Sequence, residues 1–95
     1  MSAYLLYRGT VTNPDVYKEY MKLTPDIIAK FGGKFLARGG KTITLEGNEE
    51  TRRVIVVEFP SFEQAVAFYN SPEYQAAVNI RKDAAITEMI IVDGV

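Results

Sequence analysis

The order of strand-like and helix-like segments constrains the fold of this chain more than any other feature of its sequence. Segments rich in β-branched and aromatic residues, typical of strands, alternate with segments whose apolar residues recur at helical spacing. The predicted strands cover residues 4–11, 34–45 with an interruption at Gly39 and Gly40, 53–59 and 87–92. The predicted helices follow the capping residues Asn13 and Ser61, and the second helix restarts at Pro72. The order is therefore strand, helix, strand, strand, helix, strand.

This order is the split βαβ pattern of a ferredoxin-like sandwich. Right-handed crossovers bring the strands into one four-stranded antiparallel sheet that carries the helices on a single face. A chain of 95 residues suits one such domain and leaves no room for two. We therefore predict an α+β fold with βαββαβ order that spans residues 1–95 as a single domain.

Proline and glycine mark expected irregularities. Pro25 lies inside the first helical pattern, where it lacks an N–H donor, so we expect a kink or a short break after Thr24. Gly32 and Gly33 are expected to end that helix. The pair Gly39 and Gly40 predicts a bulge or bend in the second strand, which is expected to resume over residues 42–45.

Both faces of the predicted sheet are apolar. Residues 53–59 place Val54 and Val56 on one face and Ile55 and Val57 on the other, and the last strand is also apolar on both sides. The helices cover only one face. At roughly 25 cal/mol per Å², leaving several aliphatic side chains in water forfeits several kcal/mol, and such a patch normally marks a partner. We therefore expect a homodimer with the two bare faces packed together about a two-fold axis.

Composition narrows the chemistry. The chain contains no His and no Cys, which excludes a catalytic triad, a thiol nucleophile, a disulfide and a zinc finger within it. No spacing of acidic residues resembles a calcium loop, so we expect no metal and no cofactor. A formal charge of −1 gives no electrostatic reason to expect nucleic acid or an anionic membrane. No apolar run approaches the ~18 residues that cross a bilayer and the start is unlike a signal peptide, so a cytoplasmic location is expected.

Three segments together resemble the signature of a known family. They read GGKFLARGG at 32–40, VVEFPS at 56–61 and AFYNSPEYQ at 67–75. The family they resemble is the domain-of-unknown-function family thirteen-thirty, small bacterial proteins of the dimeric α/β-barrel superfamily, and the resemblance covers essentially the whole chain. It implies a ferredoxin-like protomer whose sheet joins a second sheet to form a barrel, and it implies no established reaction. The wider superfamily contains cofactor-independent monooxygenases, lactone isomerases and haem enzymes, so the fold does not fix the chemistry.

Charged residues inside the apolar strands are the first candidates for a site, namely Arg8, Arg38 and Glu58. Reading the second hairpin back from its polar turn places Arg38 near Glu58 across the ladder. Two interpretations stay open. The charges either form an ion pair at the dimer interface that fixes its register, or the arginines hold a carboxylate or enolate while Glu58 orients it.

Tyrosines on or near the apolar helix stripes form a second candidate set: Tyr17, Tyr20, Tyr69 and Tyr74. They are either core aromatics whose hydroxyls find partners at the edge, or the walls of a pocket for a small aromatic or carbonyl ligand, with Tyr20 and Tyr69 lining it. Arg81 either ends the last helix in solvent or turns inward toward the pocket.

The leading interpretation is a homodimer that binds a small organic acid or aromatic, and the sequence leaves open whether it is a cofactor-independent enzyme. The alternative is a non-catalytic dimer whose buried charges only specify assembly. A cavity of about 300 Å³ or more that touches Arg38 and a tyrosine favours the ligand site, whereas solid packing favours the alternative. Arg52 and Arg53, beside Glu49 and Glu50, are expected to form weak surface pairs.

Overall fold

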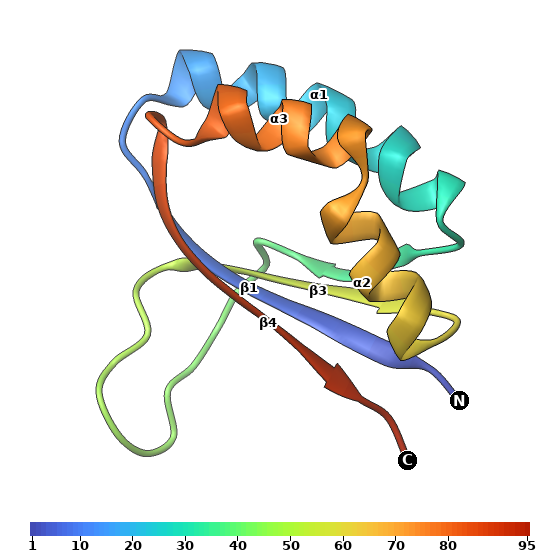
Figure 1. The fold of residues 1–95 in the computed structure, drawn as a ribbon. Coiled ribbons are helices and arrows are strands. Elements are labelled where there is room, and N and C mark those ends of the chain that lie inside the picture. The colour runs from blue at the N-terminus through green and yellow to red at the C-terminus, as the bar shows by residue number, and fades with distance from the viewer.

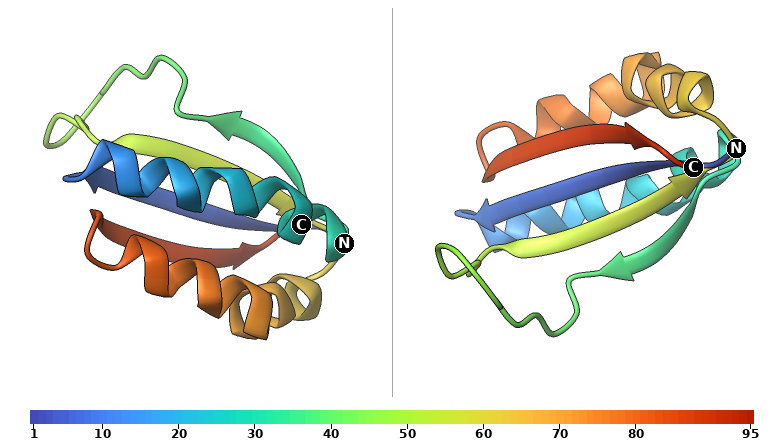
Figure 2. Two further views of the ribbon diagram at one scale, coloured as in Figure 1. Left: turned by 90° about the horizontal axis from the view of Figure 1, so that it is seen from above. Right: turned by 90° about the horizontal axis from the view of Figure 1, so that it is seen from below.

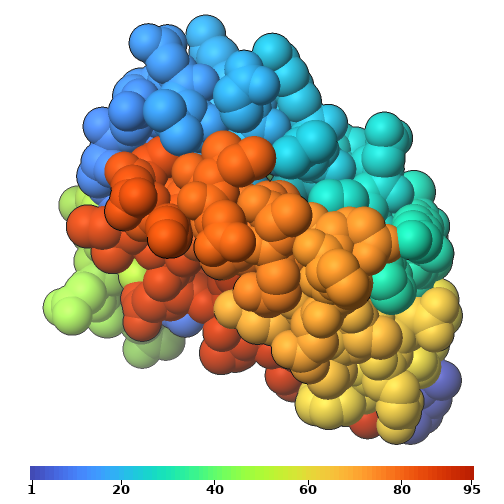
Figure 3. All heavy atoms as spheres, turned by 45° about the horizontal axis from the view of Figure 1, so that its top comes forward, coloured from blue at the N-terminus to red at the C-terminus, as the bar shows by residue number.

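The computed structural model describes residues 1–95 as four strands and three helices (Figure 1). In chain order these are β1 (Ala3–Val11), α1 (Pro14–Lys30), β2 (Lys34–Arg38), β3 (Arg53–Phe59), α2 (Phe62–Asn70), α3 (Pro72–Arg81) and β4 (Ala85–Asp93). The strands form one antiparallel sheet in the order β2-β3-β1-β4. All three helices lie on the same face of it, with α1 and α3 side by side (Figures 2 and 3). The predicted ferredoxin-like order is confirmed, and the second helix is divided at Ser71 as expected.

The helices begin where the capping chemistry predicts. Side-chain oxygens of Asn13, Ser61 and Ser71 each accept a hydrogen bond from the backbone N–H three residues further on. Pro14 and Pro72 occupy the first turns of α1 and α3, where the missing N–H costs nothing. Local sequence chemistry therefore sets these boundaries.

The sequence predicts a kink or a short break at Pro25. The break does not occur, because α1 runs continuously through this residue. A proline at this position leaves the carbonyl oxygen of Met21 without its helical donor. Two side chains replace that donor: Thr24 Oγ1 donates to the Met21 oxygen over 3.4 Å, and Arg38 Nη2 donates to it over 3.2 Å. The helix thus tolerates the proline through a contact from β2, which helical periodicity alone does not reveal.

The second strand is shorter than predicted. β2 ends at Arg38, and residues 39–52 form a loop that projects to the side away from the helices (Figure 1). Gly39 takes a φ of +70°, which turns the chain out of the sheet. Ile43 and Leu45, expected to continue the strand, are 81% and 84% exposed. The alternating pattern there is real, but no strand of this protomer pairs with it.

The core lies between the helices and the sheet. Leu5 of β1 and Val57 and Phe59 of β3 point toward the helices and are buried. The ring of Phe68 from α2 lies 5.1 Å from that of Phe59 and 4.4 Å from that of Tyr74 in α3, measured between centroids. This aromatic stack joins both C-terminal helices to the end of the central strand β3.

The opposite face of the sheet carries no helix (Figure 2). Leu6 of β1 lies between Val56 of β3 and Ile90 of β4, so an aliphatic row crosses the middle of this face. The next row carries Arg8 opposite Glu88. The bare sheet face is therefore apolar at its centre, as the sequence predicts, and charged beside it.

Arg52 links the end of the long loop to β4 on this face. Its Nε lies 2.8 Å from Glu50 Oε2, and its guanidinium also pairs with Glu88. Hydrogen bonds from Arg52 hold the pKa of both carboxyl groups below their ordinary value. A carboxyl with a lowered folded-state pKa contributes stability above its unfolded pKa and loses it as the pH falls through the lowered value.

We therefore expect the melting temperature to fall as the pH drops from about 5 to about 3, the range where carboxyl groups are protonated. Arg52→Gln is expected to melt lower than wild type at pH 7 and to lose less on acidification, because its two carboxylates no longer gain from a folded-state partner. The effect is modest because exposed pairs are worth little. Thermal unfolding followed by circular dichroism at several pH values measures both effects, and an equal acid loss in both proteins would contradict the assignment.

Candidate functional site

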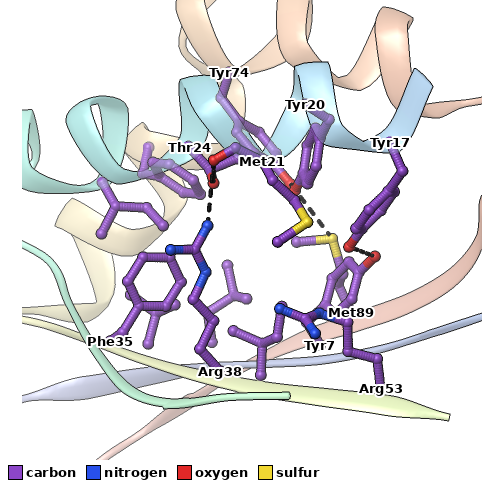
Figure 4. A pocket seen from close by; sticks show the side chains of 15 residues that line it. Tyr7, Tyr17, Tyr20, Met21, Thr24, Phe35, Arg38, Arg53, Tyr74 and Met89 are labelled. Carbon is purple, nitrogen blue, oxygen red and sulfur yellow. Dashed lines mark hydrogen bonds between the residues drawn. The ribbon is translucent and has the colours of Figure 1, made fainter. Parts of the chain in front are cut away.

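A narrow cavity lies between α1 and the sheet (Figure 4). Its walls are mainly aromatic and aliphatic, and they include Tyr7, Tyr17, Tyr20 and Tyr74. Its volume is about 30 Å³. That is room for roughly two water molecules. The cavity is therefore too small for an organic ligand in this conformation.

The tyrosine hydroxyls of this cavity are paired with one another. Tyr7 and Tyr17 share a hydrogen bond of 2.7 Å between their hydroxyl oxygens, and Tyr20 and Tyr74 share another of 2.7 Å. Burial, together with these neighbours, raises the pKa of Tyr7 and of Tyr20 well above the ordinary value. Burial also raises the pKa of Tyr74. The hydroxyls of Tyr7, Tyr20 and Tyr74 thus stay protonated and act as neutral hydrogen-bonding groups rather than as bases.

Two arginines reach into this cavity from the sheet side (Figure 4). The guanidinium of Arg38 lies 4.5 Å from the centroid of the Phe35 ring and donates to the carbonyl oxygen of Met21. Arg53 Nε is buried and has no hydrogen-bond partner. Neither arginine forms a salt bridge. Two positive charges therefore border an apolar cavity without any carboxylate to neutralise them.

Gly39 makes room for this arrangement. A Cβ atom at that position would collide with the guanidinium of Arg53, and the φ of +70° disfavours any other residue. The first glycine of the pair after Arg38 is thus explained by the close approach of Arg53 as well as by the turn.

The structure divides the predicted ligand residues between separate places. Arg38 and Tyr20 line the cavity under α1, whereas Tyr69 and Arg81 line a groove of about 370 Å³ beside β4. Ligand pockets usually measure about 300 Å³ or more. By that size the groove qualifies as it stands. The Arg38 cavity does not, so for this cavity the size test set by the sequence favours the alternative, a dimer whose charges only specify assembly, unless the cavity opens.

Arg8 and Glu58 lie on the bare face, so the sheet separates them from the cavity. The predicted proximity of Arg38 to Glu58 was wrong. Arg38 pairs with Ile55, while Lys34 stands opposite Glu58 with its Nζ 3.3 Å from Glu58 Oε1. Counting back from the turn failed because the connection is a long loop and because β2 contains a bulge that shifts its register.

Arg53 is the residue that sequence reasoning missed. The surface pair of Arg52 with Glu50 is confirmed, but Arg53 points to the other side of β3 and joins the cavity. Strand alternation carried the signal, since Arg53 has the same parity as Ile55 and Val57, which face the helices. A charged residue that shares its strand face with core residues is therefore a candidate for a binding site, even where neighbouring acidic residues suggest a surface ion pair.

Two further searches of the structure gave no site. No group of three or more His, Cys, Asp or Glu side chains is placed to hold a metal ion. None of the three helices combines the length and the apolar character needed to cross a membrane.

Known structures resemble this chain in fold. A protein of unknown function from Rhodopseudomonas palustris aligns with a TM-score of 0.74 and 23% identity over 99% of this chain and 82% of its own. SnoaB, described as a cofactor-independent oxygenase from Streptomyces nogalater, aligns with a TM-score of 0.70 and 14% identity over 99% of this chain and 93% of its own. A third structure comes from Bacteroides fragilis and is described as a dimeric protein of unknown function with a ferredoxin-like fold. It aligns with a TM-score of 0.65 and 11% identity over 98% of this chain and 96% of its own. At these identities the likeness shows the fold alone.

Sequence comparison gives the family. Among curated proteins none matches the chain. The sequence profile of the family described as "Domain of unknown function (DUF1330)" matches residues 2–95. Because this match spans nearly the whole chain and the fold is ferredoxin-like as the resemblance implied, the protein belongs to the DUF1330 family.

Proposed function

We propose that this protein is a homodimer that binds a small aromatic acid in the cavity between α1 and the sheet. The observation that carries this proposal is the pair of guanidiniums, Arg38 and Arg53, beside a tyrosine-lined cavity with no carboxylate partner. A carboxylate is a stronger acceptor for a guanidinium than a backbone carbonyl, because the hydrogen bond is charge-assisted. A ligand carboxylate would therefore replace the Met21 oxygen as the partner of Arg38.

Arg38 is also the side chain that has to move for a ring to enter. It is exposed, and its recorded contacts are the stack on Phe35 and the one hydrogen bond to Met21. Thr24 Oγ1 donates to the same Met21 oxygen. Arg38 can thus move away while the Met21 oxygen keeps a hydrogen-bond donor. Its movement would open the cavity on the side where the carboxylate binds.

The homodimer is supported by the bare sheet face. The row of Leu6, Val56 and Ile90 is contiguous and carries no helix. The Bacteroides fragilis protein of the same fold is described as dimeric. In such a dimer Arg8 and Glu58 lie at the sheet-to-sheet interface, where they would specify register rather than hold the ligand.

A second candidate function is oxygenation of an aromatic ligand without a cofactor, as SnoaB is described. The observation that favours it is again the arginine pair, because guanidiniums stabilise a phenolate or enolate. No carboxylate lines the cavity, so the ring would give up its phenol proton to solvent, and the resulting anion is the form that reacts directly with dioxygen. Oxygen uptake with a panel of hydroxylated aromatic acids tests this candidate, and uptake that is unchanged in Arg38→Ala would contradict it.

Arg38→Ala is expected to weaken the binding of 4-hydroxybenzoate at least tenfold, because a hydrogen bond to a charged group contributes roughly 1.5–3 kcal/mol. Arg38→Lys is expected to bind with intermediate affinity, since it keeps the charge but loses the planar fork. Isothermal titration calorimetry gives the dissociation constants.

Arg8→Gln is the matched control for that experiment, because Arg8 lies on the far side of the sheet. Its affinity for 4-hydroxybenzoate is expected to equal that of wild type, with the oligomeric state checked in parallel. A wild-type protein that binds neither 4-hydroxybenzoate nor any other aromatic acid tested, or an equal loss in Arg8→Gln and Arg38→Ala, would overturn the proposed site.

A further inference from the structure

The groove beside β4 contains a buried arginine that the proposed site does not use. Residues of β1, β4, α2 and α3 line this groove, whose volume is about 370 Å³. Arg81, from the last turn of α3, is only 5% exposed. Its Nη1 donates to Thr87 Oγ1 over 2.5 Å, and its guanidinium carbon lies 5.2 Å from the centroid of the Tyr20 ring. Arg81 Nε is buried and has no hydrogen-bond partner.

No acidic side chain neutralises this cation, since none of the salt bridges includes Arg81. Burial by itself opposes the charge, but Tyr74, Tyr20 and Tyr7 outweigh it and raise the pKa of Arg81. These neutral groups keep Arg81 charged but provide no counter-ion, and a guanidinium binds a carboxylate more strongly than it binds a neutral oxygen. The positive charge of Arg81 and its unpaired Nε–H group are features that an anion would satisfy.

The remaining walls of the groove indicate which kind of group is attached to the anion. They are mostly aliphatic and include Leu5, Met89, Ile90 and Ile91, with Tyr69 at one side. The cavity under α1, in contrast, has several aromatic rings among its aliphatic walls. An alkyl chain therefore suits the groove better than an aromatic ring does.

We propose that the groove beside β4 is a second binding site, in which Arg81 holds the carboxylate of a short aliphatic acid whose chain lies against Leu5, Met89 and Ile91. The groove shares the wall residues Leu5 and Met89 with the cavity under α1, but its anchoring arginine is a different one, so binding there does not depend on Arg38 or Arg53. In this site the buried guanidinium of Arg81, which has no acidic partner, is the group that recognises the ligand.

Titration with hexanoate, followed in ¹H–¹⁵N NMR spectra of the whole protein, tests this site. The Nε–H resonance of Arg81 is expected to shift progressively and to saturate, because that donor is free in the absence of ligand. Hexanol, which has the same chain and no charge, is expected to bind at least tenfold more weakly. Equal affinity for hexanoate and hexanol, or a hexanoate response confined to other resonances, would overturn the proposal.

Arg81→Met removes the charge and keeps a side chain of similar reach. It is expected to unfold at the same temperature as wild type or higher, since it removes a buried unpaired cation. It is also expected to bind hexanoate and hexanol equally weakly. Wild-type affinity for hexanoate in this variant would overturn the proposal.

Arg81→Lys keeps the experiment decisive if Arg81→Met does not fold. It is expected to bind hexanoate about tenfold more weakly than wild type, with hexanol unaffected, because a lysine cannot reproduce the guanidinium fork. Unchanged hexanoate binding in Arg81→Lys would count against the site. Arg38→Ala is the control that separates the two sites, because it is expected to lose 4-hydroxybenzoate and keep hexanoate.

Discussion

Leu6→Glu is expected to convert a dimer of about 21 kDa into a monomer of 10.6 kDa at micromolar concentration. Leu6 occupies the middle of the bare sheet face, between Val56 and Ile90. In a sheet-to-sheet dimer about a two-fold axis, each glutamate would be buried near its own symmetry mate or against aliphatic side chains. An unpaired carboxylate in such a place costs several kcal/mol, and every ~1.4 kcal/mol raises the dissociation constant tenfold. We therefore expect the dissociation constant to rise at least a hundredfold in sedimentation equilibrium.

Leu23→Glu makes the same chemical change on the helix side of the molecule. Leu23 is 41% exposed on α1, away from the bare face, so this variant is expected to remain a dimer. Circular dichroism spectra of both variants confirm that they are folded. A wild-type protein that sediments as a monomer contradicts the dimer itself, whereas a Leu6→Glu protein that stays dimeric places the interface on another surface.

The element order was predictable because its causes are local. Asn13 and Ser61 cap their helices through backbone groups three residues away, so a short stretch of sequence contains the whole interaction. The same holds for the alternation in residues 53–59, which predicts both the strand and the two faces of the sheet. These patterns needed no knowledge of what packs against them.

The errors all involve partners that lie far away in the sequence. The break expected at Pro25 is absent because Thr24 and Arg38 both donate to the Met21 oxygen, and the Arg38 contact is one that only the fold creates. Residues 42–45 alternate as a strand does, but a strand needs a neighbouring strand, and this protomer supplies none. The pairing of Lys34 rather than Arg38 with Glu58 depends on a bulge and a loop length that alternation does not encode.

The candidate site was only partly predictable for the same reason. Both interpretations of Tyr20 are compatible with the structure, since it is buried in the core and also lines the cavity under α1. Arg81 turns inward, as one of its two interpretations held, because α3 ends above β4 and places it beside Thr87. Arg53 was placed on the surface because neighbouring acidic residues outweighed its parity in the strand, although parity was the better guide.

Phe68→Ala is expected to lower the free energy of unfolding by about 3–5 kcal/mol, the usual range for removing a buried phenylalanine ring. Phe68 is 2% exposed, and its ring lies within 6.1 Å of the rings of Phe31, Phe59 and Tyr74. The loss includes the cavity that remains, because Phe31, α3 and the sheet contact this ring and cannot all close on it. Domains are typically stable by about 5–15 kcal/mol, so this variant is expected to lose a large part of its stability.

Phe62→Ala is the matched control, since it removes the same atoms from the same helix at a position that is 39% exposed. Its loss is expected to stay below about 1.5 kcal/mol, because a half-exposed ring leaves little cavity behind. Urea denaturation of the three proteins at one protein concentration measures the difference, since the stability of the proposed dimer would depend on concentration. Equal losses of stability at the two positions would mean that α2 does not pack on the sheet through Phe68. The aromatic stack would then no longer explain how the helices are held over the sheet at the two proposed binding sites.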